Sequence, residues 1–249
     1  MIYNLALLGN PVEHSNSPEI HSQFLKATNR KGSYSLIKIE TPELHDSIQR
    51  LRKLGFCGVN LTIPHKQEAL KVATQISQEA KLIGATNTLK FVDNGEIFAD
   101  NTDWLGFRDS IWTAKWENTK EATIVGVGGS ARAVMLALLK QDVENINLLI
   151  RETPSSFQNS EDLKNMVVAL EKRCKIKVEL LNEPEKVKLL IKNTDLLINT
   201  TPVGMHGISE GQSPISKGLI ETIQNRNCLV YDLIYNPAET ELLQLANKQ

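Results

Sequence analysis

The sequence is poor in cysteine, with only Cys57, Cys174 and Cys228 in 249 residues. These three residues are odd in number, lie far apart and include no Cys-x-x-Cys pair. The pattern argues against a disulfide framework and a structural zinc site, and it is typical of proteins from a reducing cytoplasm. The five histidines also lack ligand spacing such as His-x-x-x-His, so no metal site is predicted.

Long apolar runs and blocks of like charge are missing as well. No run approaches the roughly 18 residues that would indicate a membrane span, and Met1–Gly9 lacks the basic leader of a signal peptide. The 28 basic and 29 acidic side chains are interspersed and leave a net charge of -1, which argues against nucleic acid or a membrane as partner. The composition predicts a globular cytoplasmic protein of one large domain or two ordinary ones.

The first hundred residues alternate between strand and helix patterns. Strands are predicted at residues 3–9, 33–39 and 57–63, and helices at about 18–29, 42–54 and 66–76. In the second helix the apolar residues share one face: Leu44, Ile48, Leu51 and Leu54. A hairpin at residues 88–99 is predicted around the turn Asp93-Asn94-Gly95. This order predicts an α/β fold with a mainly parallel sheet covered by helices.

A second α/β unit is predicted after a connector helix at about 103–115 and a polar boundary at Glu117–Glu121. Its elements are strands at 122–125 and 146–150, strands that begin at Leu196 and Val230, and helices at 131–140 and about 238–247. We therefore predict two domains: residues 1–103 form a mainly parallel α/β domain, and residues 104–249 form a Rossmann-like doubly wound domain. The final helix is expected to pack back toward the first domain.

The turn after the strand at 122–125 carries a dinucleotide-binding pattern. Residues 126–131 match Gly-x-Gly-x-x-Gly/Ala, so the candidate cofactor-binding residues are Gly126, Gly128, Gly129, Ser130 and Ala131. Gly126 would allow the tight turn, Gly128 would let the backbone approach a pyrophosphate, and Ala131 would keep the helix close to the sheet. N–H groups at the helix start would hold the phosphates. The alternative is a plain structural turn, but the flanking strand and helix favour dinucleotide binding.

Residues at the ends of two later predicted strands are candidates for contacts with a nicotinamide cofactor. Arg151 favours a 2′-phosphate and hence NADP, whereas Glu152 would repel one if it faced it. Both residues could instead be solvated surface charges. Asn199 and Thr200 lie where ligands of doubly wound sheets bind, and they are either nicotinamide contacts or turn residues. NADP is the predicted cofactor, and NAD is the alternative.

The segment Gly58–Lys66 places a lysine directly after a strand and a proline. We expect Pro64 to open a helix, where a cation is unfavourable for the macrodipole unless it meets an anion or transfers a proton. The alternative is a solvated lysine. Two more polar clusters, Asn87-Thr88 and Asn101-Thr102-Asp103, follow apolar segments and favour a functional role for Lys66.

Seven motifs, in order, resemble the shikimate dehydrogenase family over nearly the whole chain. They are residues 9–11 with 14–18, 58–66, 84–89, 101–103, 126–133, 199–205 and 231–237. The resemblance implies two α/β domains with the active site in the cleft between them. It implies that the first domain binds a cyclohexane acid and the second binds NADPH. The implied reaction is the reversible reduction of 3-dehydroshikimate to shikimate, in the biosynthesis of chorismate and aromatic amino acids.

The resemblance also suggests roles for residues at matching positions. Lys66 and Asp103 resemble the catalytic pair, and Ser15 and Ser17 resemble ligands of the substrate carboxylate. Further positions resemble substrate contacts at Thr62, Asn87 and Tyr235, and cofactor contacts at residues 126–131, Arg151, Thr200 and Met205. Structural alternatives exist: Ser17 before Pro18 is a good N-cap, Asp103 could cap the connector helix, Thr62 fits a strand and Asn87 fits a turn. In the reductive direction the Lys66 ammonium would donate a proton while Asp103 orients it.

The sequence departs from the family pattern in three places. Ile150 stands where the family has asparagine, and Glu152 stands where it has a small residue. The stretch from Arg151 to Asp195 is long, with an extra helix predicted near 161–172, and this resembles the quinate/shikimate dehydrogenase branch that accepts NAD. After Ala246 the family continues with a glycine-bearing turn and a helix that carries a substrate-binding glutamine, whereas this sequence stops at Gln249. A longer gene product would explain the difference; a protein lacking the helix is expected to be less active or less stable.

Three other functions remain as alternatives to a NADP-dependent shikimate dehydrogenase. The first is a quinate/shikimate dehydrogenase that uses NAD. The second is a catalytically weak module that binds a shikimate-like acid, although such a module needs no proton donor like Lys66. The third is a methylene-tetrahydrofolate dehydrogenase, which shares the architecture but does not explain the serines before Pro18. A monomer and a homodimer are both compatible with the sequence.

Overall fold

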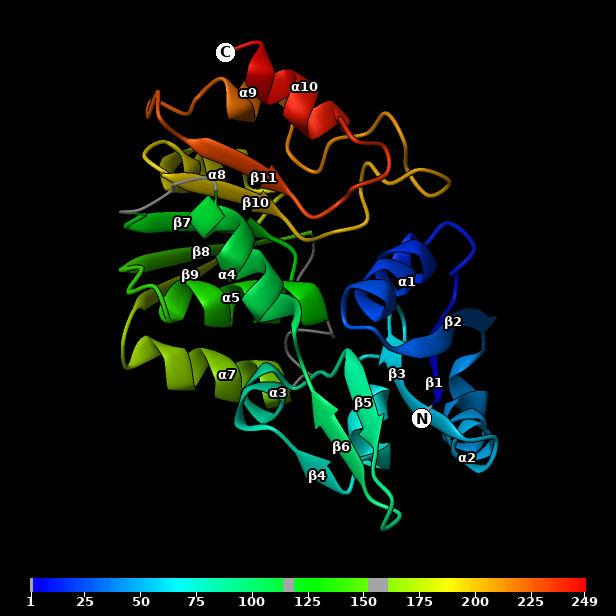
Figure 1. The fold of residues 1–249 in the computed structure, drawn as a ribbon. Coiled ribbons are helices and arrows are strands. Elements are labelled where there is room, and N and C mark those ends of the chain that lie inside the picture. Colours follow the sequence, from blue (N-terminus) through cyan, green and yellow to red (C-terminus); the bar gives the residue numbers. More distant parts are fainter. Residues whose placement is uncertain (1, 114–118, 152–160) are drawn as a thin grey trace. The chain divides into compact units, whose positions relative to one another are not determined.

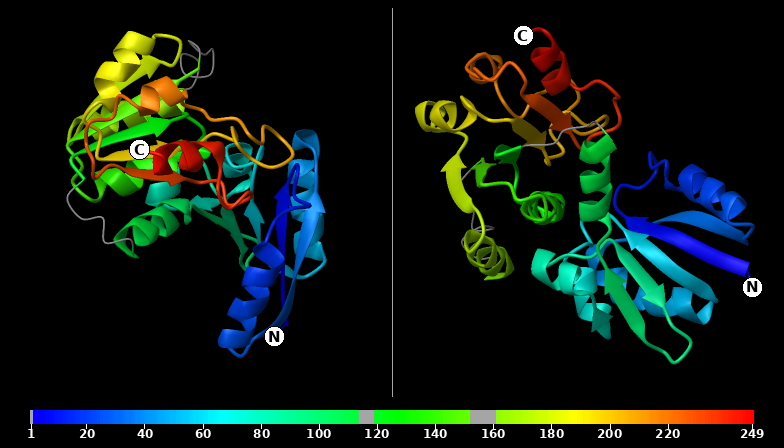
Figure 2. Two further views of the ribbon diagram at one scale, coloured as in Figure 1. Left: turned by 90° about the horizontal axis from the view of Figure 1, so that it is seen from above. Right: turned by 60° about the vertical axis from the view of Figure 1, so that its left-hand side comes forward.

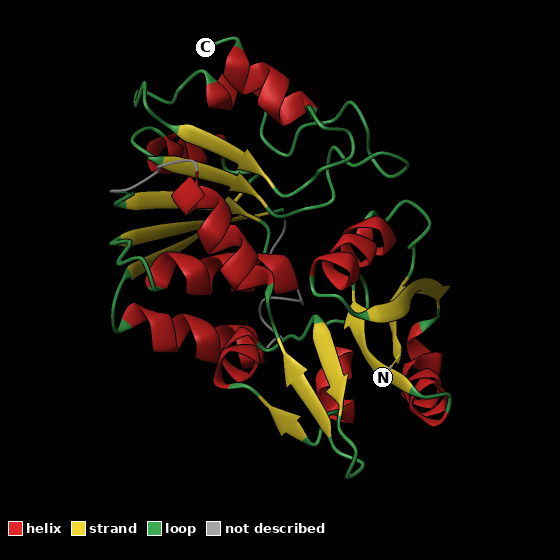
Figure 3. Cartoon of the chain, viewed as in Figure 1, coloured by secondary structure: helices red, strands yellow, loops and turns green. Residues whose placement is uncertain are grey.

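The computed structural model describes residues 2–113, 119–151 and 161–249 (Figure 1). The chain divides into two compact units, Met1–Asp103 and Trp104–Gln249. Each unit has its own sheet with helices packed on it (Figure 3). The predicted α/β class is confirmed. Part of the predicted boundary at Glu117–Glu121 and the end of the connector helix near Lys115 lie outside the described residues.

Unit 1 is built on a six-stranded sheet in the order β2-β1-β3-β5-β6-β4. Its strands are β1 (Ile2–Gly9), β2 (Lys31–Lys38), β3 (Phe56–Leu61), β4 (Gln75–Ile76), β5 (Thr88–Phe91) and β6 (Ile97–Asp100). The first three are parallel, whereas β5 runs antiparallel to both β3 and β6. The predicted hairpin is confirmed as β5 and β6, with Gly95 at a φ of 90° in the turn.

Two helices cover opposite faces of the parallel strands in unit 1 (Figures 1 and 2). Helix α2 (Leu44–Lys53) buries the apolar face that the sequence predicts, with Leu44, Ile48 and Leu51 in one core with strands β1 and β3. The prediction that Leu54 shares this face is wrong, because the helix ends at Lys53 and Leu54 is 71% exposed. Helix α1 (Ser17–Ala27) has no buried residue, and it lies along β2.

The predicted helix at 66–76 is wrong. The structure has a 3-10 helix η2 (Glu68–Val72), then strand β4, and then a helix α3 (Gln78–Ile83) that the sequence pattern did not predict. The helix stops because Ala73 is extended and the Thr74 N–H donates to the Ile97 carbonyl at 2.9 Å, which joins the chain to β6. Pairing with the sheet thus overrides the apolar spacing, and Lys66 lies in a turn rather than at a helix N-terminus.

Unit 2 contains a parallel five-stranded sheet in the order β11-β10-β7-β8-β9. The strands are β7 (Glu121–Val125), β8 (Asn145–Ile150), β9 (Lys175–Leu180), β10 (Leu196–Asn199) and β11 (Leu229–Asp232). Numbered within the unit, the order is 3-2-1-4-5, the order of a Rossmann sheet. The order reverses between β7 and β10, and there the predicted glycine turn follows β7 directly.

Helices lie on both faces of this sheet (Figure 1). They are α4 (Asp103–Thr113), α5 (Gly129–Leu139), α7 (Glu161–Glu171), α8 (Pro184–Ile191), α9 (Lys217–Ile220) and α10 (Glu241–Asn247). One core joins Val125, Leu149 and Leu197 of the strands to Val187 of α8 and Leu242 of α10. The extra helix predicted near 161–172 is confirmed as α7. Helix α10 begins at Glu241 rather than near 238, because Thr240 caps it by accepting the Leu243 N–H.

Candidate functional site

Lys66 and Asp103 form a partly buried ion pair in unit 1. The Lys66 ammonium lies 2.6 Å from Asp103 Oδ2, and the two side chains are 18% and 31% exposed. The backbone at both residues is held as well. The Lys66 carbonyl accepts the Thr86 N–H at 2.7 Å, and the Asp103 N–H donates to Asn101 Oδ1 at 3.0 Å. A short charge-assisted hydrogen bond of this kind holds the lysine in one orientation, so the structure brings the predicted pair together.

The Asn87 side chain connects this ion pair to the loop before α4. Its Nδ2 donates to Asp103 Oδ1 at 2.6 Å and to Thr102 Oγ1 at 3.0 Å. Its Oδ1 accepts the Thr102 N–H at 3.0 Å. Because a backbone N–H only donates and a carboxylate only accepts, these partners fix which end of the amide faces Asp103. Asn87 is therefore an oriented partner of the ion pair, in addition to being a residue of the turn.

Ser15 and Ser17 lie at the start of α1, and both are half-buried. Ser15 Oγ accepts the Ser17 N–H at 3.2 Å and donates to Ser17 Oγ at 3.0 Å. The alternative in which Ser17 is the N-cap is wrong, because the cap position is Asn16 and no side-chain cap bond forms there.

Tyr34 and Asn60 form a polar pair across the strands. Leu5 pairs with Tyr34 and Leu7 pairs with Asn60, so both polar side chains lie on the same face of the sheet. The Tyr34 hydroxyl donates to Asn60 Oδ1 at 2.9 Å. The Tyr34 ring stacks on His21 of α1, with 4.1 Å between the ring centroids. Burial raises the pKa of Tyr34 to about 12 and lowers the pKa of His21, so at neutral pH the phenol keeps its proton.

Thr62 begins the turn that carries Lys66. Its carbonyl accepts the His65 N–H at 2.9 Å. A Cβ on Gly9 would clash with Thr62 Cγ2, so glycine is required where the end of β1 passes this side chain. His65 is fully buried, and its Nε2 lies 3.0 Å from the Ile39 carbonyl. The imidazole therefore anchors the turn next to Lys66 to the core of unit 1.

The glycine turn of unit 2 leads from β7 into α5. Gly126 has a φ of 108°, and a Cβ there would lie 2.7 Å from Thr200 Oγ1, so only glycine fits. Gly128 is the N-cap of α5, and a Cβ there would meet nothing within 4 Å. Gly129 and Ser130 open the helix, and Ala131 is fully buried against the sheet. Open space before a helix N-terminus suits a phosphate group.

Thr200 lies at the end of β10, next to the glycine turn. Its hydroxyl donates to the Val125 carbonyl at 2.6 Å, so it joins the ends of β7 and β10 where the strand order reverses. Asn199 is fully buried, and its amide donates to the Val203 carbonyl at 3.1 Å and to Asp232 Oδ1 at 3.0 Å. These contacts favour the turn role among the two roles that the sequence leaves open for Asn199.

The remaining predicted residues lie in loops of unit 2. Arg151 is exposed directly after β8, and Glu152 lies outside the described residues. Met205 is half-buried in the turn after β10, where its N–H donates to the Pro202 carbonyl at 3.1 Å. Tyr235 follows β11 and is 60% exposed. Tyr235 thus belongs to unit 2, whereas the other predicted substrate contacts belong to unit 1.

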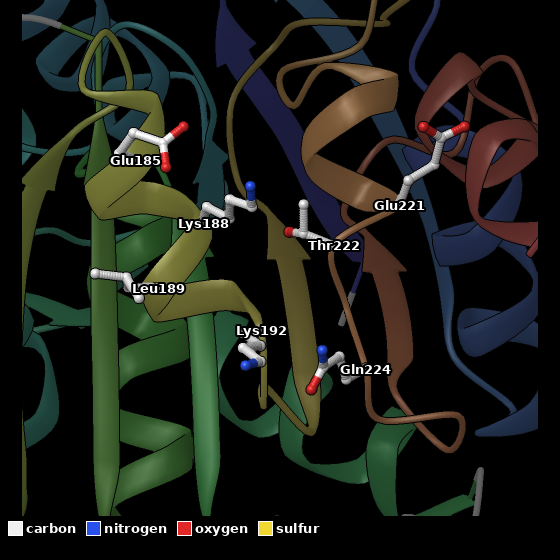
Figure 4. Close-up of a pocket in the computed structure, with 7 residues that line it drawn as sticks. All are labelled: Glu185, Lys188, Leu189, Lys192, Glu221, Thr222 and Gln224. Carbon is white, nitrogen blue, oxygen red and sulfur yellow. The ribbon is translucent and has the colours of Figure 1, made fainter.

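A surface pocket of about 370 Å³ lies between α8 and the segment after α9 (Figure 4). Its lining carries both charges and comprises Glu185, Lys188, Leu189, Lys192, Glu221, Thr222 and Gln224. None of these residues is a predicted site residue. Among the described residues, no group of three or more His, Cys, Asp and Glu side chains could hold a metal ion. In the same part of the chain, no helix combines the length and the apolar character needed to cross a membrane.

The sequence indicates no role for five other residues of unit 1 that make the contacts described above: His21, Tyr34, Asn60, His65 and Thr88. Two of them could have been found from the sequence, because Asn60 is a polar residue within an apolar strand and Thr88 directly follows Asn87. Tyr34 could not, since its partner Asn60 lies two strands away in the sheet.

The first unit of the chain is an α/β unit with a Lys–Asp ion pair. The second unit has a sheet in Rossmann order with a glycine turn. Together they define the class of the protein as a two-unit α/β protein with a Rossmann-like second unit. A sequence model of the shikimate dehydrogenase substrate binding domain matches residues 7–89. The shikimate dehydrogenase (NADP(+)) of Roseobacter denitrificans is 35% identical over 246 residues, which cover 98% of this chain and 82% of the relative. The chain therefore belongs to the shikimate dehydrogenase family.

Solved structures agree with this assignment. The shikimate 5-dehydrogenase of Thermus thermophilus, in complex with NADP(H) and shikimate, is similar with a TM-score of 0.79 and 31% identity, covering 99% of this chain and 84% of that chain. The shikimate 5-dehydrogenase of Listeria monocytogenes, in complex with shikimate and NAD, is similar with a TM-score of 0.84 and 25% identity, covering 99% and 83%. The predicted family is confirmed.

Proposed function

We propose that this protein is a NADP-dependent shikimate dehydrogenase that interconverts shikimate and 3-dehydroshikimate. The ion pair between Lys66 and Asp103, at 2.6 Å, is the observation that supports the proposal best, because the reaction requires one proton at the ring oxygen. Family membership and the names of the relatives support the substrate and the cofactor.

Lys66 acts as the proton donor in the reductive direction. An ammonium has three donors, and Asp103 takes one of them, which leaves others for a ligand oxygen. Asp103 holds the ammonium in place and stabilises its charge before the proton leaves. The 18% exposure of the Lys66 side chain lets solvent restore the proton after each turnover. A positioned acid of this kind typically accelerates a reaction by roughly 10²–10⁴-fold.

Residues of unit 1 also bind and orient the substrate in this proposal. Ser15 and Ser17 bind the ring carboxylate, and Thr62 and Asn87 contact the ring hydroxyls, while Tyr235 contributes from unit 2. In the domain assignment that we propose, residues 1–103 therefore bind the acid and residues 104–249 bind the dinucleotide.

The residues of the glycine turn fit a nicotinamide dinucleotide. The backbone at Gly128, Gly129 and Ser130 would hold the pyrophosphate, because a Cβ at Gly128 meets open space and α5 begins there. Arg151, at the end of β8, would meet a 2′-phosphate. The dinucleotide supplies the hydride when it is bound.

Replacing Lys66 tests the proposal. We expect Lys66→Ala to lower kcat by at least about a hundredfold, because the proton donor is lost, while the Kd for NADPH stays the same. Lys71→Ala is the matched control, since Lys71 lies on η2 nearby and its side chain is 74% exposed. Near wild-type turnover in Lys66→Ala would exclude Lys66 as the acid.

The alternative function is a quinate/shikimate dehydrogenase that uses NAD, and Ile150 before Arg151 is the observation that favours it. Values of kcat/KM for shikimate and quinate, each with NADP and NAD, separate the two enzymes. A higher kcat/KM with NAD and quinate would replace the proposed function by the alternative. Binding of shikimate without turnover under all four conditions would indicate a binding module.

A further inference from the structure

We infer that Asp232 is a positioning residue that holds the loop after β10, residues 200–205, in the shape that binds the cofactor. The inference rests on the cofactor-binding part of the function proposed above, and it adds a residue to which no role has been assigned. This loop carries Thr200 and Met205, the cofactor contacts that the family resemblance implies.

The strands β10 and β11 end next to each other in unit 2. They are parallel neighbours, and Asn199 at the end of β10 pairs in register with Asp232 at the end of β11. Side chains of residues paired in this way lie on the same face of the sheet. Ligands of a doubly wound sheet bind beyond the carboxyl ends of its strands. Asn199 and Asp232 therefore meet at the edge of the sheet where a dinucleotide is expected.

The Asn199 side chain shapes the loop. Its Oδ1 accepts the Thr201 N–H at 2.9 Å and the Thr201 hydroxyl at 2.7 Å. Its Nδ2 donates to the Val203 carbonyl at 3.1 Å. These bonds close residues 199–203 into a tight turn, and Met205 follows two residues later. Because Asn199 is fully buried, the shape of this turn depends on which way its amide faces.

The Asp232 carboxylate fixes that orientation. Its Oδ1 accepts Asn199 Nδ2 and the Ile234 N–H, both at 3.0 Å, and its Oδ2 accepts the Thr240 hydroxyl at 2.7 Å. A carboxylate only accepts, so an Asn199 amide turned by half a rotation would place its oxygen against Asp232. Asp232 thus excludes the orientation in which the bonds inside the turn would be lost.

This position needs the Oδ1 atom of Asp232 rather than a negative charge. Burial raises the pKa of Asp232 above its ordinary value, and the three hydrogen bonds offset only part of this effect. A half-buried carboxylate of this kind adds little stability through its charge. An asparagine would keep an oxygen toward Asn199 and the Ile234 N–H, because both of these partners donate.

The variant Asp232→Ser removes the link to Asn199, because serine is shorter, while its hydroxyl can still accept the Ile234 N–H. We expect the Kd for NADPH to rise about five- to twentyfold, since the loop then samples other shapes and only a fraction of molecules can bind. Asp232→Asn should bring the Kd back to within about twofold of wild type, because Oδ1 is restored. Fluorescence titration measures the Kd, and calorimetry measures the Tm.

Asp195→Ala is the matched control. Asp195 lies just before the opposite end of β10, and its carboxylate also accepts hydrogen bonds from two backbone N–H groups, of Lys120 and Glu121, and from the Asn225 amide. We expect this variant to lower the Tm and to leave the Kd for NADPH unchanged. The same result in Asp232→Ser, a lower Tm with an unchanged Kd, would show a purely structural role and overturn the inference.

A double-mutant cycle shows whether Asp232 acts through Asn199. Asn199→Ala should itself raise the Kd for NADPH, and adding Asp232→Ser should then change it by less than about twofold, because the shared bond is already lost. Either single variant tests the inference if the other does not fold. Fully multiplicative effects overturn the inference and leave the proposed function intact. Wild-type protein that binds NADPH but does not oxidise shikimate with NADP or NAD overturns the proposed function, whereas the Kd values still decide the inference.

Discussion

His21 shows how a single half-buried contact makes stability depend on pH. Its ring stacks on Tyr34, and burial lowers its pKa from the ordinary value of 6.5. The unfolded chain therefore binds a proton at His21 more readily than the folded protein does. Stability from the neutral ring is fully present above the unfolded pKa, and it is lost as pH falls from about 6.5 toward the lower folded pKa.

We predict that His21→Asn flattens this part of the pH dependence of stability. The free energy of unfolding from urea titrations at several values of pH between about 7.5 and 5 measures the slope. His45→Asn is the control, because His45 of α2 is exposed and the variant should keep the wild-type slope. An unchanged slope in His21→Asn would show that other groups cause the acid sensitivity of unit 1.

Individual residues were predictable where their chemistry had few alternatives. Lys66 stood out because it follows a strand and a proline, and Asn87 and Asp103 stood out because their polar clusters follow apolar segments. The structure joins the three side chains through two contacts of 2.6 Å. Tyr34 could not be predicted, since a tyrosine at an alternating strand position has the same pattern whether it fills a core or donates a hydrogen bond. The pairing of β2 with β1 and of β1 with β3, which the sequence does not reveal, brings Tyr34 near Asn60.

At the scale of the elements, two glycines in the turn between β7 and α5 have different structural roles. At Gly126 the backbone has a φ of 108° and a Cβ would contact Thr200. At Gly128 the φ of -69° suits any residue and a Cβ would reach open space. The first glycine is thus required by the fold, whereas the second is required only if a ligand approaches the backbone.

Gly126→Ala is predicted to destabilise unit 2 by about 1–3 kcal/mol, through the strained backbone and the clash with Thr200. Gly128→Ala is predicted to leave the Tm unchanged or slightly higher, because alanine restricts the unfolded chain. The same variant should raise the Kd for NADPH at least about tenfold, because the added methyl group occupies the approach to the helix N-terminus. Calorimetry for Tm and fluorescence titration for Kd measure both effects. Wild-type affinity in Gly128→Ala would refute the phosphate-binding role of the turn.

Elements were predicted well where one local pattern dominated, as for α2 and for β7 followed by α5. The segment 66–76 failed because its apolar residues serve two purposes. Leu70 and Ile76 both pack against the core of unit 1, yet one lies in η2 and the other in a strand paired with β6. Helical spacing in a sequence cannot show a strand partner that comes about 20 residues later.

At the scale of the whole molecule, the two units have separate sheets and separate cores. If the proposed domain assignment is right, each ligand should slow amide hydrogen exchange in a different unit. NADPH should protect residues 126–131, and shikimate should protect residues 15–17 and 58–66. Mass spectrometry of peptic fragments after exchange with each ligand alone measures this. Protection of residues 126–131 by shikimate alone would contradict the assignment.

The hydrogen bonds from Tyr34 to Asn60 and from Asn87 to Asp103 lie within residues 1–103, whereas the glycine turn and Arg151 lie within residues 104–249. If the proposed roles are right, the residues that bind the nucleotide and most of the residues that bind the acid can therefore mutate under separate selection. A lineage that changes the residues after β8 can adopt a different nicotinamide carrier while the proton-transfer chemistry is inherited unaltered.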